Sequence, residues 1–524
     1  MVDEFDYVVV GAGTAGSVVA SRLSARGAAV LVLEAGGPWI PAAVDQAPLW
    51  FTLLGSPVDW AYGSVPQEGL ARRVTYEPRG RLPGGTSNLY IMMHVRGHPS
   101  DFDNWAYQGA AGWSYQDVRP YFERLESREN AHPAGTGGPQ TVTDASRHEP
   151  NPYSRLFLDA CRELGYPERA DFNRGDMLGA GWHQLNVRDG RRRGALHCYL
   201  EPAVGAGLSL RTNALVTRLL VEHGRCVGVE HRQAVAEAGG PGRTLRGPNV
   251  TAAGPGVHQV RARHEVVLCA GAIESPKILM LSGIGEPSQL GKHGIPVRVP
   301  LPGVGENFHN HVLTGIITET RDTVPPGRQN LSEVALFLTS QPGLPAPDLQ
   351  IAFVHVPFDI IVGQQHPNAV SILPGVVRPA SRGWIRLASP RPADPPLVNP
   401  NYLGDRSDLD RLVQGVELAR ELFATAAFSA VLKDELLPGP ATSGTEALRR
   451  FVRERADSYH HQAGSCRMGS DEGAVVDPQL RVHGCEGLRV ADASVMPAVP
   501  SGNPHAAILM IGERCADFLC PPVN

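Results

Sequence analysis

A short apolar run, a glycine-rich turn and a helical pattern open the chain, and this order constrains the fold more than any other feature. Residues 7–10 read YVVV, which is typical of a buried parallel strand, and GAGTAG follows directly at residues 11–16. Residues 17–25 predict a helix with one apolar face, and residues 28–33 predict a second strand that leads to Glu34. Strand, turn, helix, strand and acid in this order predict a βαβ unit that binds a dinucleotide.

Each residue type in the turn has a physical reason. Gly11 permits the tight turn, Gly13 lets the backbone approach a pyrophosphate, and Gly16 lets the helix pack closely on the strand. The helix begins near Thr14 and Ala15, where free backbone N–H groups can bind the phosphates. These five residues are therefore predicted cofactor contacts.

The acid at the end of the second strand completes the predicted site. Glu34 can accept hydrogen bonds from ribose hydroxyls, and we expect Ala35 to lie beside it. A glutamate here argues against a cofactor with a 2′-phosphate. The turn by itself fits FAD and NAD equally. An ordinary glycine-rich turn is the alternative interpretation, because the chain has 58 glycines.

The composition narrows the class of protein. A chain of 524 residues is longer than one hydrophobic core usually supports, so we expect two domains. The hydrophobic fraction of 42% and the net charge of −5 indicate a globular protein with no nucleic-acid partner and no strong membrane signal. The eight cysteines form no C-x-x-C pair and the first residues show no secretory pattern. We therefore expect a reduced, cytoplasmic protein.

Two histidine-bearing segments near the C-terminus suggest acid/base chemistry. His461 lies in YHHQAGSCRM at residues 459–468, and His505 ends GNPH at residues 502–505. Imidazole has an unperturbed pKa near neutrality, which suits a group that takes a proton from a hydroxyl. A dinucleotide site together with such a pair indicates a redox enzyme. A structural histidine is the alternative for each.

Two further histidines, His309 and His311, have the spacing of a metal pair. The sequence around them supplies no cysteine or carboxylate at the spacing of a zinc site. We therefore predict no metal.

Four long segments resemble the glucose–methanol–choline (GMC) flavoprotein oxidoreductases. GRLPGGTSNL at residues 80–89 is similar to the first signature of that family, and GAIESPKILMLSGIG at residues 271–285 is similar to the second. GVGENFHNH at residues 303–311 and VADASVMP at residues 490–497 resemble two further family segments. The resemblance implies FAD as the cofactor and hydride transfer to the flavin, with His461 as general base and His505 as its assistant.

The resemblance also implies a set of flavin contacts, which supplements those of the opening turn. The stretch that follows Arg79 has small residues where a chain must run close to a planar ring, which favours a buried cofactor wall. The implied contacts are Arg79, Gly84, Gly85, Thr86, Asn88, Leu89, Val216, Ala270, Gly271, Asp492, Ala493, Asn503 and Pro504.

This chain departs from the family at three positions in the first signature or just after it. Pro83 stands where an aliphatic residue is usual, Tyr90 where asparagine is usual, and His94 where an aromatic residue is common. Some members attach FAD through a histidine in this signature. Because the aligned position here is Leu89, we expect noncovalent FAD.

The expected fold class is α/β, with a Rossmann-like FAD-binding domain interleaved with a substrate domain built on an antiparallel sheet. We expect the FAD-binding domain at residues 1–150, 190–311 and 456–524, the last part with both catalytic histidines, and the substrate domain at residues 312–455. Strand patterns fall at 348–356 and 383–387, and helical patterns at 409–423 and 445–455. Residues 131–151 and 232–259 are expected to form exposed loops, the second as a long hairpin excursion.

The resemblance implies oxidation of a primary alcohol to an aldehyde, with oxygen, a quinone or a protein as electron acceptor. The substrate body is expected to be aromatic or otherwise small and uncharged, and a homodimer is one expected assembly. The alternatives are a hydroxynitrile lyase that keeps FAD as structure, a light-driven fatty-acid decarboxylase, and a flavin-binding module without catalysis.

Overall fold

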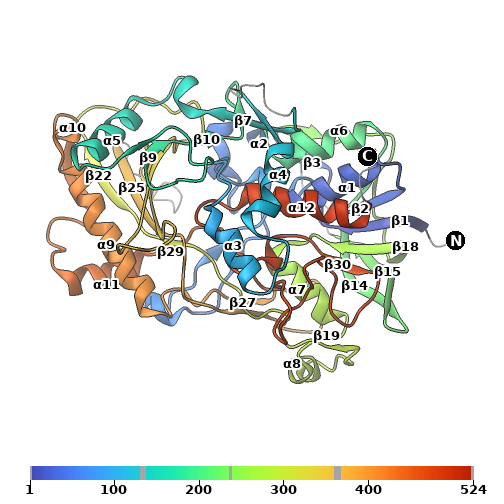
Figure 1. The fold of residues 1–524 in the computed structure, drawn as a ribbon. Helices are drawn as coiled ribbons and strands as arrows, with labels where there is room; N and C mark the ends of the chain where they lie inside the picture. The colour runs from blue at the N-terminus through green and yellow to red at the C-terminus, as the bar shows by residue number, and fades with distance from the viewer. Residues whose placement is uncertain (1–2, 130–136, 235–238, 359–367, 521–524) are drawn as a thin grey trace.

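Two sheets, joined by helices that run between them, organise the chain (Figure 1). The computed structural model describes residues 3–129, 137–234, 239–358 and 368–520. In Figure 1 the first sheet lies on the right, beside both termini, and the second lies on the left. The architecture is the mixed α/β class that the sequence predicts.

The first sheet is mainly parallel at its centre. Val8 of β1 pairs with Leu31 of β2 on one side and with Val266 of β18 on the other. Val8 is fully buried, as expected for a strand covered on both faces. The sheet contains β14 (Ala214–Glu222), β15 (Arg225–Gln233), β18 (Val257–Leu268), β1 (Asp3–Val10), β2 (Val30–Leu33), β13 (Ser209–Thr212) and β17 (Val250–Ala252), and β30 (Leu488–Val490) pairs with β18.

The second sheet is almost wholly antiparallel, which confirms the predicted substrate-side sheet. It contains β28 (Leu432–Leu437), β22 (Ile316–Thr320), β25 (Ala369–Val376), β24 (Leu349–Val354), β23 (Val334–Leu338), β9 (Gly179–Trp182) and β8 (Glu168–Arg169), with β21 (Val312–Leu313) and β29 (Asp457–Ser458) beside it. Helices α9 (Arg406–Phe423), α5 (Pro152–Glu163) and α10 (Ala426–Ser429) cover it, and α11 (Thr445–Arg455) packs on α9 (Figure 1). The predicted domain boundaries stay a prediction.

Most of the predicted elements are confirmed to within a few residues. The helices expected at 409–423 and 445–455 are α9 and α11, and the strand expected at 348–356 is β24. The helix expected at 17–25 is α1 (Thr14–Ala25), which begins directly after Gly13. The strand expected at 383–387 is β26 (Trp384–Arg386), which pairs with β27 (Leu397–Asn399).

The two expected loops are partly wrong. Residues 140–144 form the buried strand β7 (Gln140–Asp144), which pairs with β6 (Glu126–Arg128) and β10 (Gln184–Leu185). Residues 250–252 form β17 at the edge of the first sheet, and β16 (Gly242–Thr244) pairs with β3 (Trp39–Pro41). Glycine and proline dominate these stretches, so the pairing with distant strands left no local signal. Residues 131–136 and 235–238 lie outside the described residues.

None of the described helices is both long and apolar enough to cross a bilayer.

The remaining elements connect the two sheets or lie on their surfaces. These elements include α2 (Ala42–Asp45), η1 (Ala47–Leu53), β4 (Tyr62–Gly63), β5 (Tyr76–Glu77), η3 (Gly85–Asn88), α3 (Pro99–Tyr107), α4 (Tyr115–Leu125), β11 (Val187–Arg188), β12 (Arg191–Arg192), η5 (Leu196–Leu200), α6 (Glu201–Gly205), α7 (Gly271–Leu281), β19 (Ile284–Gly285), α8 (Pro287–Lys292), β20 (Val299–Pro300), η7 (Ala493–Val495) and α12 (His505–Leu519).

Helix α12 runs along α1 through the middle of the molecule (Figure 1). A salt bridge with a fully buried carboxylate holds the two helices together. Arg22 of α1 donates to Glu513 of α12 through Nε at 2.9 Å and through Nη2 at 2.7 Å, and Arg124 of α4 adds a third contact at 3.1 Å. The side chain of Glu513 is fully buried. This clamp holds the helix whose first residue is His505.

We expect the substitution Glu513→Gln to destabilise the protein, because it leaves two arginines with weaker acceptors. The free energy of unfolding should fall by roughly 1.5–3 kcal/mol, the net value of hydrogen bonds to charged groups. Denaturant unfolding measures it. The control is Glu68→Gln, which removes an exposed pair with Arg72 and should cost at most about 1 kcal/mol. Equal losses in the two variants would contradict the clamp.

Candidate functional site

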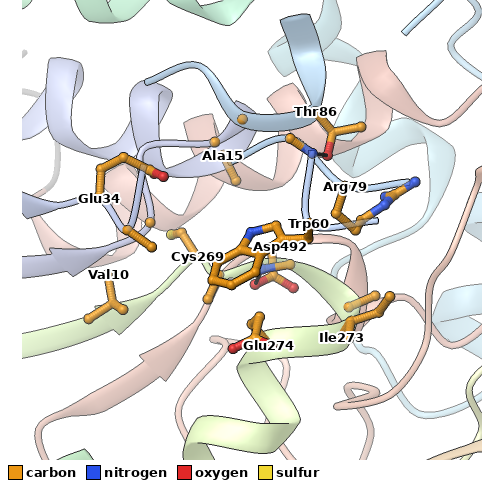
Figure 2. Close-up of a pocket in the computed structure, with 18 of the residues that line it drawn as sticks. Val10, Ala15, Glu34, Trp60, Arg79, Thr86, Cys269, Ile273, Glu274 and Asp492 are labelled. Atoms are coloured by element: carbon orange, nitrogen blue, oxygen red, sulfur yellow. Dashed lines mark hydrogen bonds between the residues drawn. The ribbon is translucent and has the colours of Figure 1, made fainter. Parts of the chain in front are cut away.

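A cleft opens at the carboxyl ends of the central strands of the first sheet. Its volume is about 950 Å³, and Val10 of β1 and Leu33 of β2 lie on its wall. Figure 2 shows Glu34 on one side of this cleft and Arg79 on the other, with the indole ring of Trp60 between them. Ligands bind at this edge of open α/β sheets, where the strands end and the helices begin.

The glycine-rich turn has the geometry that the sequence predicts. Gly11 has a φ of +98°, and a Cβ atom there would lie 2.6 Å from the carbonyl oxygen of Cys269. A Cβ atom at Gly16 would lie 2.0 Å from the carbonyl oxygen of Gly11, so the helix could not pack this closely with any other residue. Gly11, Gly13, Thr14 and Ala15 line the cleft, whereas Gly16 packs behind it.

The carboxylate of Glu34 is held by two backbone N–H groups, one in the glycine-rich turn and one just after Glu34 itself. Its Oε2 accepts the N–H of Ala12 at 2.9 Å, and its Oε1 accepts the N–H of Gly36 at 2.8 Å. The residue is 6% exposed, and burial raises the pKa of its carboxyl to about 7. Each oxygen keeps a second lone pair for a donor in the cleft. Ala35 lines the cleft next to it.

A second helix N-terminus also faces the cleft. Ala270 and Gly271 line it at the start of α7, and Asp492 holds this start in place. Asp492 Oδ2 accepts the N–H of Gly271 at 2.9 Å and the hydroxyl of Ser275 at 2.6 Å. Ala493 and Val216 lie on the same wall. The start of α1 offers backbone N–H groups to a phosphate-containing ligand, whereas at the start of α7 the N–H groups of Ala270 and Gly271 already donate to Ser275 and Asp492.

Sequence reasoning missed one wall of this cleft. Trp60 and Tyr62 stack with ring centroids 5.8 Å apart, and Tyr62 donates its hydroxyl to Glu274 Oε1 at 2.7 Å. The Nζ atom of Lys277 lies 3.1 Å from both oxygens of Glu274. Of these four residues, only Glu274 and Lys277 of α7 lie in a segment that the sequence identified as a motif. The aromatic pair reaches the cleft through a loop without a motif.

A second cavity of about 1150 Å³ adjoins the cleft, and Thr14, Arg79, Thr86 and Ile508 line both. Polar and apolar residues contribute almost equally to its remaining walls, but most of the wall surface that faces the cavity is apolar. The apolar residues on its walls are Trp50, Leu54, Leu89, Ile91, Met93, Leu313, Val354, Phe358, Leu373 and Ile508. Both predicted catalytic histidines line this cavity, with Asn503 and Pro504 beside them.

His461 is held on three sides. Its Nε2 lies 3.1 Å from Asn503 Nδ2, and its Nδ1 lies 2.9 Å from His311 Nδ1. The ring of Tyr459 stacks on it at 4.7 Å between centroids. Burial lowers the pKa of His461 well below 6.5, and the nearby rings of His311 and His460 lower it further. The imidazole is therefore neutral at physiological pH and can accept a proton.

His505 is the first residue of α12 and points its ring into the same cavity. Its Nδ1 lies 3.5 Å from the hydroxyl oxygen of Thr14, and within the described part of the chain its buried Nε2 has no partner. Burial lowers the pKa of His505 to about 3. An unpartnered buried nitrogen costs free energy, so its presence beside a cavity indicates a ligand atom that completes it.

The other predicted contacts fall into two groups. Gly85, Thr86 and Leu89 line one or both hollows, whereas Gly84 and Asn88 do not. Asn88 is fully buried and donates through Nδ2 to the carbonyl oxygen of Pro83 at 2.7 Å, so it shapes the loop from behind. The roles predicted for individual site residues stay predictions.

His309, one of the two histidines with the spacing of a metal pair, bonds within the protein through both ring nitrogens. Its Nδ1 lies 2.6 Å from the carbonyl oxygen of Asn307, and its Nε2 accepts the N–H of Val499 at 2.9 Å. Both ring nitrogens are used in holding loops together. Across the described ranges no group of three or more potential ligands could hold a metal ion.

Comparison with known proteins identifies the family. Models of the GMC oxidoreductases match residues 5–313 and residues 379–512. The chain belongs to the GMC oxidoreductase family. The two matched regions contain all the residues that line the cleft and both histidines, whereas Val354, Phe358 and Leu373 of the second cavity lie between them.

Three GMC relatives illustrate the similarity. The mitochondrial choline dehydrogenase of Homo sapiens is 38% identical over 557 residues, which cover 99% of this chain and 90% of that protein. The structure of pyridoxine 4-oxidase from Mesorbium loti has a TM-score of 0.88 and 32% identity and covers 98% of both chains. A formate oxidase variant from Aspergillus oryzae RIB40, solved to study FAD modification, has a TM-score of 0.87 and 25% identity, covering 99% of this chain and 98% of its own.

Membership of the GMC family makes this protein an FAD-dependent oxidoreductase that acts on CH–OH groups. The residues present fit that cofactor. The cleft offers the start of α1 for a pyrophosphate and the Glu34 carboxylate for a ribose, and it opens into the histidine-lined cavity at Thr14, Arg79 and Thr86. A long, two-ended ligand is what such a pair of joined hollows accommodates.

We expect Glu34→Gln to weaken FAD binding, because an amide can accept at one of its two polar atoms only, while the N–H groups of Ala12 and Gly36 need both. The loss should be roughly 1–3 kcal/mol, the cost of leaving a buried donor unpaired. The change in the FAD dissociation constant, obtained by titrating the protein and measuring released flavin, gives this loss of binding free energy. At full flavin occupancy the reduction rate should match that of the parent. A large rate loss would show that Glu34 does more than anchor the cofactor.

Proposed function

We propose that this protein oxidises a primary alcohol to an aldehyde, with His461 as the general base and His505 as its assistant. One observation supports this most directly. Two neutral imidazoles line one mainly apolar cavity, and that cavity joins the cofactor cleft. FAD, when bound, supplies the acceptor for the hydride of the alcohol carbon.

The proposed roles follow from the contacts of each ring. His461 takes the hydroxyl proton at Nε2, which is unprotonated because it accepts from Asn503. This nitrogen has one lone pair, so the substrate hydroxyl replaces Asn503 as the donor to it. His311 and Tyr459 keep the ring in place. His505 can hold its proton on the otherwise unpartnered Nε2 and donate it to the substrate oxygen, where negative charge develops.

The cavity supports a substrate with an uncharged aromatic or other small apolar body. Its walls are largely apolar, and its junction with the cleft carries the guanidinium of Arg79, which repels cations. Among the described lining residues none is a carboxylate that could balance a cationic substrate. Choline carries such a charge, so we propose that this protein favours uncharged alcohols over choline.

Further features of the function are also proposed. The electron acceptor is oxygen, a quinone or a protein. FAD is held noncovalently, the protein acts in the cytoplasm, and it forms a homodimer. The aliphatic Leu89 on the cavity wall supports the noncovalent cofactor, because it offers no nucleophile to the ring methyl group.

An anaerobic reduction screen tests the proposal. The flavin-loaded protein is mixed with benzylic, aliphatic and cationic alcohols, choline included, and flavin absorbance is followed before air is admitted. Bleaching by an uncharged alcohol supports the proposal, and recovery in air identifies oxygen as an acceptor. If no alcohol bleaches the flavin, the proposal is wrong. Cyanide release from hydroxynitriles or loss of fatty acid under blue light would then identify a different chemistry.

We expect His461→Ala to lower the flavin-reduction rate by a factor on the order of 10²–10⁴, the contribution of a positioned general base. FAD content should stay near that of the parent. His505→Asn should be milder, since asparagine can still donate to the substrate oxygen. Stopped-flow absorbance with the best alcohol gives both rates. Unchanged reduction in His461→Ala would show that His461 is not the base.

We expect the reduction rate to be level above pH 6.5 and to fall only in more acidic solution. Burial lowers the pKa values of His461 and His505, so both rings are neutral above pH 6.5 and protonate only below it. A protonated ring cannot accept the hydroxyl proton. The apparent pKa belongs to the pair and not to either ring. A rate that rises through a pKa above 6.5 would contradict this assignment.

We expect acid or heat to release intact FAD from the protein, because no covalent bond holds it. Flavin fluorescence should move wholly to the supernatant after precipitation, and free FAD should be recovered by chromatography. Flavin fluorescence that stays with the washed pellet would show covalent attachment.

A further inference from the structure

Tyr90 and His94, two of the positions that depart from the first GMC signature, belong to one hydrogen-bonded chain. Tyr90 lines the second cavity, and its ring centroid lies 4.4 Å from that of His505 with an angle of 44° between the planes. His94 is fully buried behind it. The side chain of Asn186 joins the two.

The chain runs away from the cavity in three links, with one side branch at Asn186. Tyr90 donates its hydroxyl to Asn186 Oδ1 at 2.8 Å. Asn186 Nδ2 lies 3.2 Å from His94 Nδ1 and donates to the carbonyl oxygen of Thr141 at 2.8 Å. His94 Nε2 lies 2.9 Å from Glu126 Oε1. Asn186, His94 and Glu126 are at most 2% exposed, so water does not compete for these bonds.

The direction of every bond follows from the chemistry of the groups. Nδ2 of Asn186 can only donate, so His94 Nδ1 must accept and the proton of His94 lies on Nε2. That proton is donated to Glu126, whose charge is balanced by Arg96 at 2.6 Å and by Arg128 at 2.6 Å. Arg96 and the hydrogen bond from His94 hold the pKa of the Glu126 carboxyl well below its usual value, although burial opposes them. A charged acceptor at the end strengthens each bond along the chain.

Tyr90 is also held from its backbone and from its ring face. The guanidinium of Arg192 donates to the carbonyl oxygen of Tyr90 at 2.7 Å, and its Cζ lies 5.4 Å from the centre of the ring. The ring therefore lies against the guanidinium and against the imidazole of His505, and its hydroxyl is tethered to Asn186. A ring fixed at so many points restricts the rotation of the imidazole that it touches.

We propose that Tyr90 is a positioning residue, whose tethered ring holds the imidazole of His505 so that Nε2 faces the substrate oxygen. Asn186, His94 and Glu126 act through Tyr90. This inference rests on the proposed role of His505 in alcohol oxidation. The asparagine that is usual at this position has no ring and could not supply the packing contact.

The substitution Tyr90→Phe tests the tether, because it keeps the ring and removes only the hydroxyl. FAD content should not change, and the limiting rate of flavin reduction should fall about three- to tenfold, which corresponds to the net value of one hydrogen bond. The apparent Kd for the alcohol should change less than the rate. The control is Tyr7→Phe, which removes a hydroxyl that donates to Leu519 at 3.1 Å and lies on neither hollow, and which should leave the rate unchanged.

A double substitution separates positioning from general damage. Asn186→Leu breaks the same chain one link further on, and it should lower the rate about as much as Tyr90→Phe does. If both act through the hydroxyl of Tyr90, the double variant should be no slower than the slower single variant. Multiplied losses, or a Tyr90→Phe rate equal to that of the parent, would overturn the proposal while leaving the alcohol oxidation itself intact.

A spectroscopic measurement keeps the two proposals apart. In flavin-loaded protein labelled with ¹⁵N-histidine, the signals of His505 are those lost in His505→Asn. Tyr90→Phe should shift them, and His94 should show a neutral ring protonated at Nε2. Unmoved His505 signals would overturn the positioning role. A parent protein that no alcohol reduces would instead overturn the proposed function, and the histidine signals would still decide the role of Tyr90.

Discussion

The parallel pairing of β1 with β2 and β18 is the constraint on which the rest of the structure depends. This register makes Val10, Leu33 and Leu268 end at the same edge of the sheet. Three segments far apart in sequence therefore meet there: the glycine turn, the acidic end of β2 and the start of α7. Because parallel strands need long crossovers, the chain must leave this sheet repeatedly, and its excursions build the second sheet and the cavity beside it.

Helix α12 connects this sheet to the chemistry of the second cavity. Its first residue, His505, lies on the cavity, while its buried Glu513 is fastened to α1, whose own N-terminus faces the cofactor cleft. Because the two helices are held together, the position of His505 and the position of the phosphate site depend on each other. Tyr90 extends this arrangement from the other wall, through ring contact with His505 and hydrogen bonds that end at a charged Glu126.

Burial shifts the pKa values of the site residues in opposite directions at the two hollows. It raises the pKa of Glu34, because a carboxylate loses hydration, and it lowers the pKa values of His461 and His505, because an imidazolium loses hydration. Both shifts favour the neutral form. Neutral imidazoles can take or share a hydroxyl proton at physiological pH, and a mainly apolar cavity strengthens the few polar contacts within it. The same desolvation therefore supports acid/base chemistry and selects against charged substrates.

The sequence by itself determined the elements that local periodicity encodes: the β1–α1–β2 unit, β24, α9, α11 and the two histidine segments. It also indicated the family, because its motifs are long and ordered. Only the tertiary structure decided that β7 and β17 are strands, that Trp60 and Tyr62 line the cleft, and that His311 and Asn503 hold His461. These features depend on contacts between residues far apart in the chain. Strand pairing and side-chain hydrogen bonds over such separations leave no periodic trace in the segments that make them.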